Sequence, residues 1–363
     1  MVVRPQSLKE YVGQEQIKQE IEKAVRASKE RGEAFGHTLL TGFAGCGKTS
    51  LAAVIAAEMK VDFVPLFASS ITKPTDLKEI LRTRLNSEGY VFDEPEPKIP
   101  SEIKPTILFI DEIHNLPLKV RETLYTVMED RTYDEEETNP WNKRKTVSKT
   151  WVPKFTLIGA TTREGVLEKP FLDRFKYTFK VEKYTDAECE FFVQTTINKA
   201  AEKLTDLVIS PEAKQGIAKR SRGTARTTIQ LTERCIDYFI GSGLSGEIKE
   251  DLITKAFRDM KIDSNGLNYI DYRILLYLHK CYRPIGVKGI ATALEETTDS
   301  IEKNYEPHLV SKGLIMRTPN GRVISEDGVK YLRDRKLINH DNKRVIKDEG
   351  WTLWTRQKSL YKS

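Results

Sequence analysis

The sequence feature that most constrains the fold is a glycine-rich octapeptide at residues 42–49, GFAGCGKT, which matches the pattern G-x-x-x-x-G-K-[S/T]. Its glycines let the backbone curl so that successive amide hydrogens converge on phosphate oxygens. A short apolar strand is expected before it at 37–41, and a helical pattern follows it at 49–59. Because this arrangement places phosphate at a helix N-terminus, the sequence predicts an ATP-binding α/β domain.

Each position of the loop has an expected chemical role. Lys48 reaches the β- and γ-phosphates, and the Thr49 hydroxyl ligates Mg²⁺. A glycine-rich turn that matches by chance is the alternative, and the flanking strand and helix argue against it. Cys46 is expected to be a small apolar filler, since the chemistry of the loop belongs to backbone amides. The nucleotide-binding residues expected from this segment are Gly42, Gly45, Gly47, Lys48, Thr49 and Ser50.

Further apolar runs predict a parallel sheet with helices on both faces. They lie at 62–66, 106–110 and 155–159, and a helical pattern at 14–29 precedes the glycine loop. Short apolar runs separated by helical patterns are typical of strands that are buried on both sides.

Two carboxylates end the run at 106–110. Asp111 is expected to hold Mg²⁺ at the end of the strand, and Glu112 to orient or deprotonate the attacking water. The alternative, a solvated acidic turn, is disfavoured by the phosphate loop.

Thr162, which follows the run at 155–159, brings a hydroxyl toward the γ-phosphate. Arg174 and Arg226 are candidates for stabilising the charge of the transition state.

Two segments interrupt the first half of the chain. Residues 87–104 are acidic and contain prolines, so they predict a surface insertion. Residues 132–152 predict a protruding hairpin whose tip, 141–145 (WNKRK), is aromatic and basic.

The second half of the chain reads as two further domains and a tail. Amphipathic patterns at 186–203, 210–220 and 225–240 predict an all-helical domain without strands. Patterns at 269–281, 287–295 and 300–312, followed by strands at 313–317 and 321–324, predict three helices and a hairpin, which is a winged helix. The expected domains are 1–183 for the ATPase, 184–262 for the helical lid, 263–333 for the winged helix and 334–363 for a basic tail of unassigned fold.

Length, net charge, cysteine content and the lengths of the apolar stretches limit the class of protein. A length of 363 residues predicts two or three domains. The net charge of +6 permits nucleic-acid binding without demonstrating it. Four dispersed cysteines without a CxxC pair argue against a disulfide framework and a zinc site. No apolar stretch is long enough to span a bilayer, so we expect no membrane partner and a cytoplasmic location in a bacterial or phage-infected cell.

A series of short motifs occurs in order from about Arg4 to Leu332. They are 4–5 (RP), 11–14 (YVGQ), 111–114 (DEIH), 128–130 (MED), 155–163 (FTLIGATTR), 173–175 (DRF), 220–224 (RSRGT) and 317–322 (RTPNGR). Together they resemble the RuvB family of AAA+ ATPases, which are Holliday-junction branch-migration motors. The resemblance implies a hexameric ring around duplex DNA that drives branch migration by hydrolysing ATP with Mg²⁺.

The same resemblance implies roles for individual residues. Thr162 is the first sensor, Arg226 is the second sensor on the lid, and Arg174 is an arginine finger that enters the neighbouring subunit's site. Arg317 and Arg322 place guanidinium groups on DNA, where the alternative is a surface hairpin with solvated arginines. Further nucleotide contacts are implied for Arg4, Tyr11, Val12, Glu129, Asp130 and Tyr184.

The chain also departs from the family pattern. The loop reads FAGC at 43–46 where the family usually has PPGL, Ala225 replaces a proline, and Asn320 replaces an arginine of the wing. The basic tip of the hairpin at 132–152 differs most, since the family presents an apolar surface there to a RuvA partner.

Because of these departures we keep two alternative functions open: an AAA+ loader that places another protein on DNA, and a nucleotide-gated DNA-binding regulator. The partner of the hairpin is RuvA-like or another junction-binding protein.

Overall fold

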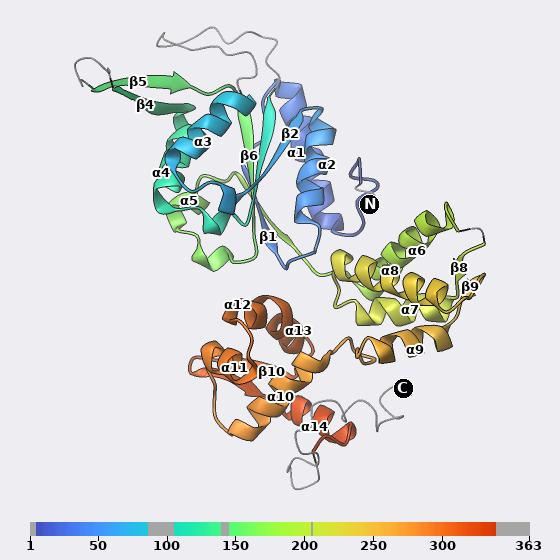
Figure 1. The fold of residues 1–363 in the computed structure, drawn as a ribbon. Helices are drawn as coiled ribbons and strands as arrows, with labels where there is room; N and C mark the ends of the chain where they lie inside the picture. Colours follow the sequence, from blue (N-terminus) through green and yellow to red (C-terminus); the bar gives the residue numbers. More distant parts are fainter. Residues whose placement is uncertain (1–4, 86–104, 139–144, 205, 339–363) are drawn as a thin grey trace. The chain divides into compact units, whose positions relative to one another are not determined.

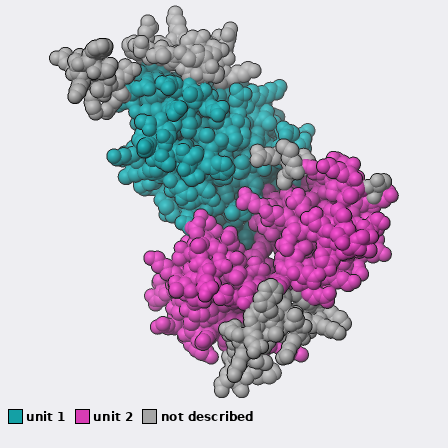
Figure 2. All heavy atoms as spheres, viewed as in Figure 1, with its two compact units in different colours: residues 1–183 teal, residues 184–363 magenta. Residues whose placement is uncertain are grey.

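The computed structural model describes residues 5–85, 105–138, 145–204 and 206–338. The chain divides into two compact units, Met1–Lys183 and Tyr184–Ser363 (Figure 2). Arg4, the insertion at 87–104, the hairpin tip at 141–144 and the tail beyond 338 lie outside the described residues. Among the described helices, none is both long enough and apolar enough to cross a membrane.

The first unit contains a five-stranded sheet in the order β2-β3-β6-β1-β7, with every neighbouring pair parallel (Figure 1). This confirms the predicted parallel sheet. The chain passes from β1 to the far edge of the sheet at β2 and then returns toward β1. In open α/β sheets, ligands bind at the carboxyl ends of the strands where the strand order reverses in this way. The strands are β1 (Thr38–Gly42), β2 (Asp62–Phe67), β3 (Thr106–Asp111), β6 (Phe155–Thr161) and β7 (Tyr177–Val181).

Helices cover both faces of this sheet (Figure 1). The side chains of β3 alternate between the two faces of the sheet. Ile107 and Phe109 pack against one group of helices, and Leu108 and Ile110 pack against the other. The first group is α1 (Glu15–Arg31) and α2 (Lys48–Met59), and the second is α3 (Pro74–Ile80), α4 (Leu118–Asp130) and α5 (Lys169–Leu172). Short turns of helix are η1 (Ala68–Ser70), η2 (Leu81–Leu85), η3 (Ile113–Asn115) and η4 (Glu164–Val166).

A separate antiparallel hairpin extends from this unit (Figure 1). It consists of β4 (Thr132–Thr138) and β5 (Lys145–Trp151), with Thr132 paired to Trp151 at its base. The predicted hairpin at 132–152 is thereby confirmed, apart from its tip.

The second unit begins with a helical lid. Three of its helices match the predicted patterns, and their N-termini are capped by Thr185, Ser210 and Thr224, whose side chains accept hydrogen bonds from the first turn. The expectation that strands stop after 184 misses a two-residue parallel pair, which is too short to give a periodic signal. The elements are α6 (Asp186–Ala201), β8 (Val208–Ile209), α7 (Pro211–Arg220), α8 (Ala225–Gly241), β9 (Glu247–Ile248) and α9 (Glu250–Asp259).

A winged helix follows, as predicted, with its own apolar core. The single helix expected at 300–312 is divided into three short segments. Pro307 lies in the first turn of the last segment and has no amide hydrogen to continue the preceding helix. The elements are α10 (Tyr269–Cys281), α11 (Val287–Leu294), α12 (Thr298–Ser300), η5 (Ile301–Tyr305), α13 (Glu306–Ser311), β10 (Ile315–Thr318), β11 (Gly321–Ile324) and α14 (Glu326–Asp334).

Candidate nucleotide-binding and DNA-binding sites

The glycine loop joins β1 to α2 at the carboxyl edge of the sheet. Gly42, Gly45 and Gly47 all have positive φ angles, of 135°, 79° and 92°. At Gly42 a side chain would also collide with the neighbouring strand, because a Cβ atom there would lie 2.2 Å from the carbonyl oxygen of Val181. The loop therefore needs glycine both for its backbone conformation and for close contact with β7.

Lys48 spans this loop. Its Nζ atom donates hydrogen bonds to the carbonyl oxygens of Gly42 at 2.8 Å and Phe43 at 2.9 Å, and the residue is only 7% exposed. Lys48 is also the first residue of α2, so Thr49 and Ser50 lie in its first turn, where the helix dipole favours an anion. This brings the loop residues predicted to bind phosphate together at one helix N-terminus.

The loop is supported from behind by buried side chains. Tyr11 is 3% exposed, and its hydroxyl lies 3.5 Å from the carbonyl oxygen of Cys46 and 3.4 Å from that of Gly47. Cys46 is fully buried in the core that contains α1 and α2, which agrees with its predicted role as an apolar filler. The adenine contacts expected of Tyr11 and the half-buried Val12 stay predictions.

The two carboxylates follow β3 at the same edge. One strand, β6, separates β3 from β1, so Asp111 and the start of the loop are about 10 Å apart across the sheet. Glu112 has a φ angle of 51°, which is unusual for a residue with a side chain, and its amide donates to Oδ1 of Asp111 at 3.0 Å. Ile113 packs so tightly against Gly159 that a Cβ atom there would lie 2.7 Å from its Cδ1 atom. This packing holds the acidic turn in place.

Polar side chains fix the orientation of the Glu112 carboxylate. The Thr162 hydroxyl donates to Oε2 of Glu112 at 3.1 Å, which brings the predicted first sensor and the predicted base into contact. His114 contacts the same oxygen: its Nδ1 atom lies 3.3 Å from Oε2 of Glu112 and 2.8 Å from Oγ1 of Thr161. The sequence motifs assigned no role to His114. The available signal was its place in the DEIH motif at 111–114, two residues after Glu112.

Arg174 lies at the opposite, amino edge of the sheet. It precedes Tyr177, which pairs with Thr38 at the start of β1, whereas the phosphate loop leaves the end of that strand, about 13 Å away. The Arg174 guanidinium forms an ion pair with Glu129 at 2.9 Å and lies over the Tyr125 ring at 4.7 Å. Arg174 is therefore remote from the phosphate loop of its own subunit.

Glu129 and Asp130 share that remote position. The end of α4 lies at the amino edge, since Glu129 pairs with Arg174 and the Val152 amide, just before β6, donates to the carbonyl oxygen of Arg131 at 2.7 Å. Both acidic side chains are exposed at this edge. If either contacts nucleotide as predicted, the nucleotide belongs to another subunit.

The lid carries the other two predicted nucleotide contacts. Arg226 is exposed in the first turn of α8, and no hydrogen bond or ion pair of its side chain occurs within the described residues. Tyr184 is 5% exposed and packs edge-on against the Phe192 ring. Its amide donates to the carbonyl oxygen of Gly223 at 2.9 Å, so it is bound to the turn that precedes α8.

The two wing arginines share one buried carboxylate. Glu306, whose side chain is 2% exposed, accepts from Nε of Arg317 and, at 3.0 Å, from Nη2 of Arg322. Arg322 also lies 3.5 Å from Glu302 and is 20% exposed, whereas Arg317 is 60% exposed. Their roles therefore differ: Arg322 anchors β11 to the helical part of the domain, and Arg317 faces solvent.

Hard oxygen donors suit the predicted magnesium. Thr49 and Asp111 offer a hydroxyl and a carboxylate at the loop edge, and Mg²⁺ usually takes few protein ligands together with phosphate and water. No cluster of three His, Cys, Asp or Glu residues able to hold a metal occurs in the part of the chain that the structure describes.

Burial raises the pKa of the Cys235 thiol to about 12, so this cysteine is not a reactive nucleophile.

Three family models match the chain. Residues 3–96 and 98–181 match the P-loop domain of the Holliday junction DNA helicase RuvB, 190–263 match the RuvB AAA lid domain, and 264–333 match the RuvB C-terminal winged helix domain.

Similar proteins include two curated relatives, each a Holliday junction branch migration complex subunit RuvB. The one from Streptococcus equi subsp. equi is 36% identical over 335 residues, covering 91% of both chains. The one from Rickettsia africae is 36% identical over 333 residues, covering 91% of this chain and 90% of the relative.

Solved structures of RuvB are also similar to this chain. The Thermotoga maritima RuvB Holliday junction branch migration motor is 32% identical, with a TM-score of 0.75, and the match covers 91% of this chain and 98% of that chain. A P216G mutant of the same protein gives a TM-score of 0.76.

Proposed function

Since the chain belongs to the RuvB family of AAA+ ATPases, we propose that it hydrolyses ATP to drive branch migration of Holliday-junction DNA. The observation that carries the proposal is the contact of Thr162 with Glu112 at the phosphate-loop edge, together with the position of Arg174 at the opposite edge. The first supports hydrolysis, and the second supports a motor assembled from several subunits.

The residues at the carboxyl edge divide the chemistry of hydrolysis among them. The loop amides and Lys48 bind the phosphates, and Thr49 with Asp111 would hold Mg²⁺, which neutralises charge on the β- and γ-phosphates. Glu112 orients the attacking water and accepts its proton. Thr162 donates to that carboxylate, so we propose that it reports the presence of the γ-phosphate to Glu112.

Arg174 completes the site in trans. A ring in which each subunit presents its amino edge to the carboxyl edge of the next would bring Arg174 to the γ-phosphate of the neighbour. Such a head-to-tail interface supports the hexamer implied by the family. We propose that Arg226 and Tyr184 reach the nucleotide from the lid, which would make the lid respond to hydrolysis.

The winged helix would contact the DNA. Arg317 is the wing arginine that faces solvent, so we propose it as the phosphate contact, while the ion pairs of Arg322 favour a supporting role. The hairpin β4–β5 is the proposed docking site for a junction-binding partner of the RuvA type.

The test is ATPase activity with and without a synthetic four-way junction, alongside migration of that junction. We expect junction DNA to stimulate turnover, and branch migration to require ATP. The Lys48→Ala variant should abolish both activities and serves as the control. ATP hydrolysis that is indifferent to junction DNA, without branch migration in the presence of the cognate partner, would contradict the proposal.

A loader that places another protein on DNA is the second candidate. Its partner would bind the same hairpin β4–β5, which extends from the sheet and bears exposed Val147 on the described part of its surface. Recovery of a clamp or helicase with the wild-type chain, lost on Val147→Asp, would support this candidate.

A further inference from the structure

One short turn organises the residues through which the lid is proposed to contact nucleotide. We call residues 221–224, between α7 and α8, the lid turn. Arg222 and Gly223 have positive φ angles of 59° and 69°, and Thr224 caps α8 two residues before Arg226. Since Tyr184 also donates to the backbone of Gly223, a shift of the lid turn would move both nucleotide-contacting candidates.

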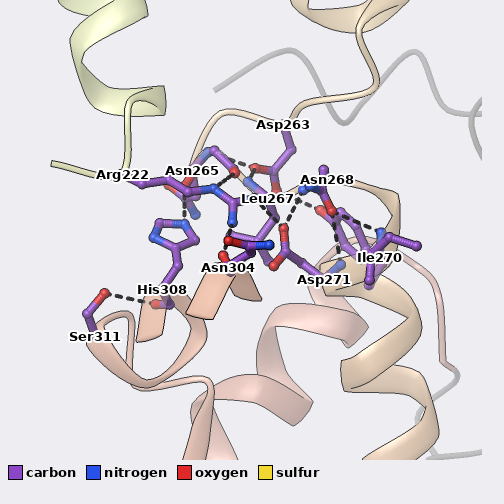
Figure 3. A network of polar contacts seen from close by, with 12 residues as sticks. Arg222, Asp263, Asn265, Leu267, Asn268, Ile270, Asp271, Asn304, His308 and Ser311 are labelled. Carbon is purple, nitrogen blue, oxygen red and sulfur yellow. Dashed lines mark hydrogen bonds and ion pairs between the residues drawn. The ribbon is translucent and has the colours of Figure 1, made fainter. Parts of the chain in front are cut away.

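The side chain of Arg222 leaves the lid and ends in the winged-helix domain (Figure 3). Its Nη2 atom donates to Oδ2 of Asp271 at 2.5 Å, its Nε atom to the carbonyl oxygen of Gly266 at 3.1 Å, and its Nη1 atom to that of Asn304 at 3.1 Å. These three acceptors come from the first turn of α10, the loop before it and η5. The planar guanidinium group thus binds three separate segments of the winged-helix domain. These contacts fix the orientation of the lid turn relative to that domain as well as the distance between them.

Both ends of this contact are held firmly. Asp271 is fully buried and also accepts from the Asn268 amide at 2.7 Å, where it completes the cap of α10. Gly266 lies directly against the lid, because a Cβ atom there would be 2.7 Å from the carbonyl oxygen of Arg220. Burial raises the pKa of Asp271 to about 6 although Arg222 lowers it, so near neutral pH the guanidinium faces a buried carboxylate.

We propose that Arg222 is a positioning residue that couples the ATPase cycle to movement of DNA, by tying the lid turn to the first helix of the winged-helix domain. The inference rests on the proposed function of the chain as a DNA motor. When nucleotide displaces Arg226, the lid turn moves, and Arg222 makes the DNA-binding domain move with it. Without Arg222 the lid still closes on nucleotide, but the winged helix no longer follows in a fixed direction.

The test compares full-length Arg222→Ala with wild type and with Arg258→Ala, a matched control that removes an exposed arginine from α9 of the same lid. We expect kcat and KM for ATP without DNA to stay within about twofold of wild type, while junction migration slows about tenfold. Arg222→Lys should restore migration only in part, because an ammonium group cannot reach three diverging acceptors.

Three results would overturn the inference. Equal losses of ATPase and migration would make Arg222 merely structural, and unchanged migration would make it dispensable. Wild-type protein that hydrolyses ATP without moving junctions would remove the proposed function and the inference together, which distinguishes that failure from the first two.

A second variant covers the case in which Arg222→Ala does not fold. Asp271→Asn keeps an acceptor for Arg222 and for Asn268 but removes the ion pair. We expect a smaller uncoupling in the same direction, with faster hydrogen exchange in residues 263–268. Normal exchange and normal migration in Asp271→Asn would overturn the inference.

Discussion

The two edges of the parallel sheet carry different halves of one proposed active site. The carboxyl edge holds the phosphate loop, Asp111 and Glu112, with Thr162 and His114 both in contact with Oε2 of Glu112. The amino edge holds Arg174, Glu129 and the base of the hairpin β4–β5. Because both edges belong to the same rigid sheet, neither can reach the other within a subunit. This separation is what favours the proposal that catalysis takes place at an interface between subunits.

The largest effect on ATP turnover is expected from a substitution at the amino edge. Arg174→Ala should lower kcat for ATP by about 10³-fold, since an arginine finger stabilises the charge of the transition state. Binding of an ATP analogue should change little, because the phosphate loop lies on the other edge. Steady-state turnover and analogue binding measure the two quantities.

Arg31→Ala is the matched control, since Arg31 is an exposed arginine at the end of α1 that pairs with Glu33 at 2.7 Å. It should leave kcat unchanged. Loss of analogue binding in Arg174→Ala would place its function within its own subunit's site.

At the carboxyl edge, Glu112→Gln should lower kcat by about 10²-fold while ATP stays bound, because an amide orients water but accepts no proton. Single-turnover phosphate release checks this. Undiminished release would mean that hydrolysis does not depend on this site.

A smaller effect is expected for His114. His114→Ala should lower kcat about tenfold, because Glu112 loses one of the two side chains that orient it. The KM for ATP should stay the same. A change confined to KM would show that His114 affects nucleotide binding instead.

The smallest effect is expected for Glu129. Its ion pair with Arg174 is half exposed, so Glu129→Gln should change kcat by only about two- to threefold. A loss as large as that of Arg174→Ala would mean that Glu129 itself contributes to the site in trans.

The local structure around each motif is readable from the sequence. The octapeptide at 42–49 and the run before Asp111 predict their own conformations, because glycine spacing and apolar runs are short-range signals. The winged helix is also predictable, although Pro307 divides its third helix. The pair β8–β9 is too short for any period to reveal it.

The contacts between distant residues could not be predicted. Arg222 and Asp271 are separated by 49 positions, and nothing local indicates that the guanidinium crosses into the next domain. Likewise, the sequence assigns Arg317 and Arg322 the same role, whereas Glu306 anchors one of them more deeply than the other. Sequence patterns indicate which side chains are available, and packing decides which of them are already paired.

The central claim, that the two edges meet only between subunits, is tested most directly by mixing Glu112→Gln with Arg174→Ala. Each variant alone should be nearly inactive. In mixed rings an intact Glu112 can meet an intact Arg174, so random 1:1 assembly should restore about one quarter of wild-type ATPase per subunit, since interfaces are head-to-tail. A mixture no more active than the two variants assayed separately would contradict the account.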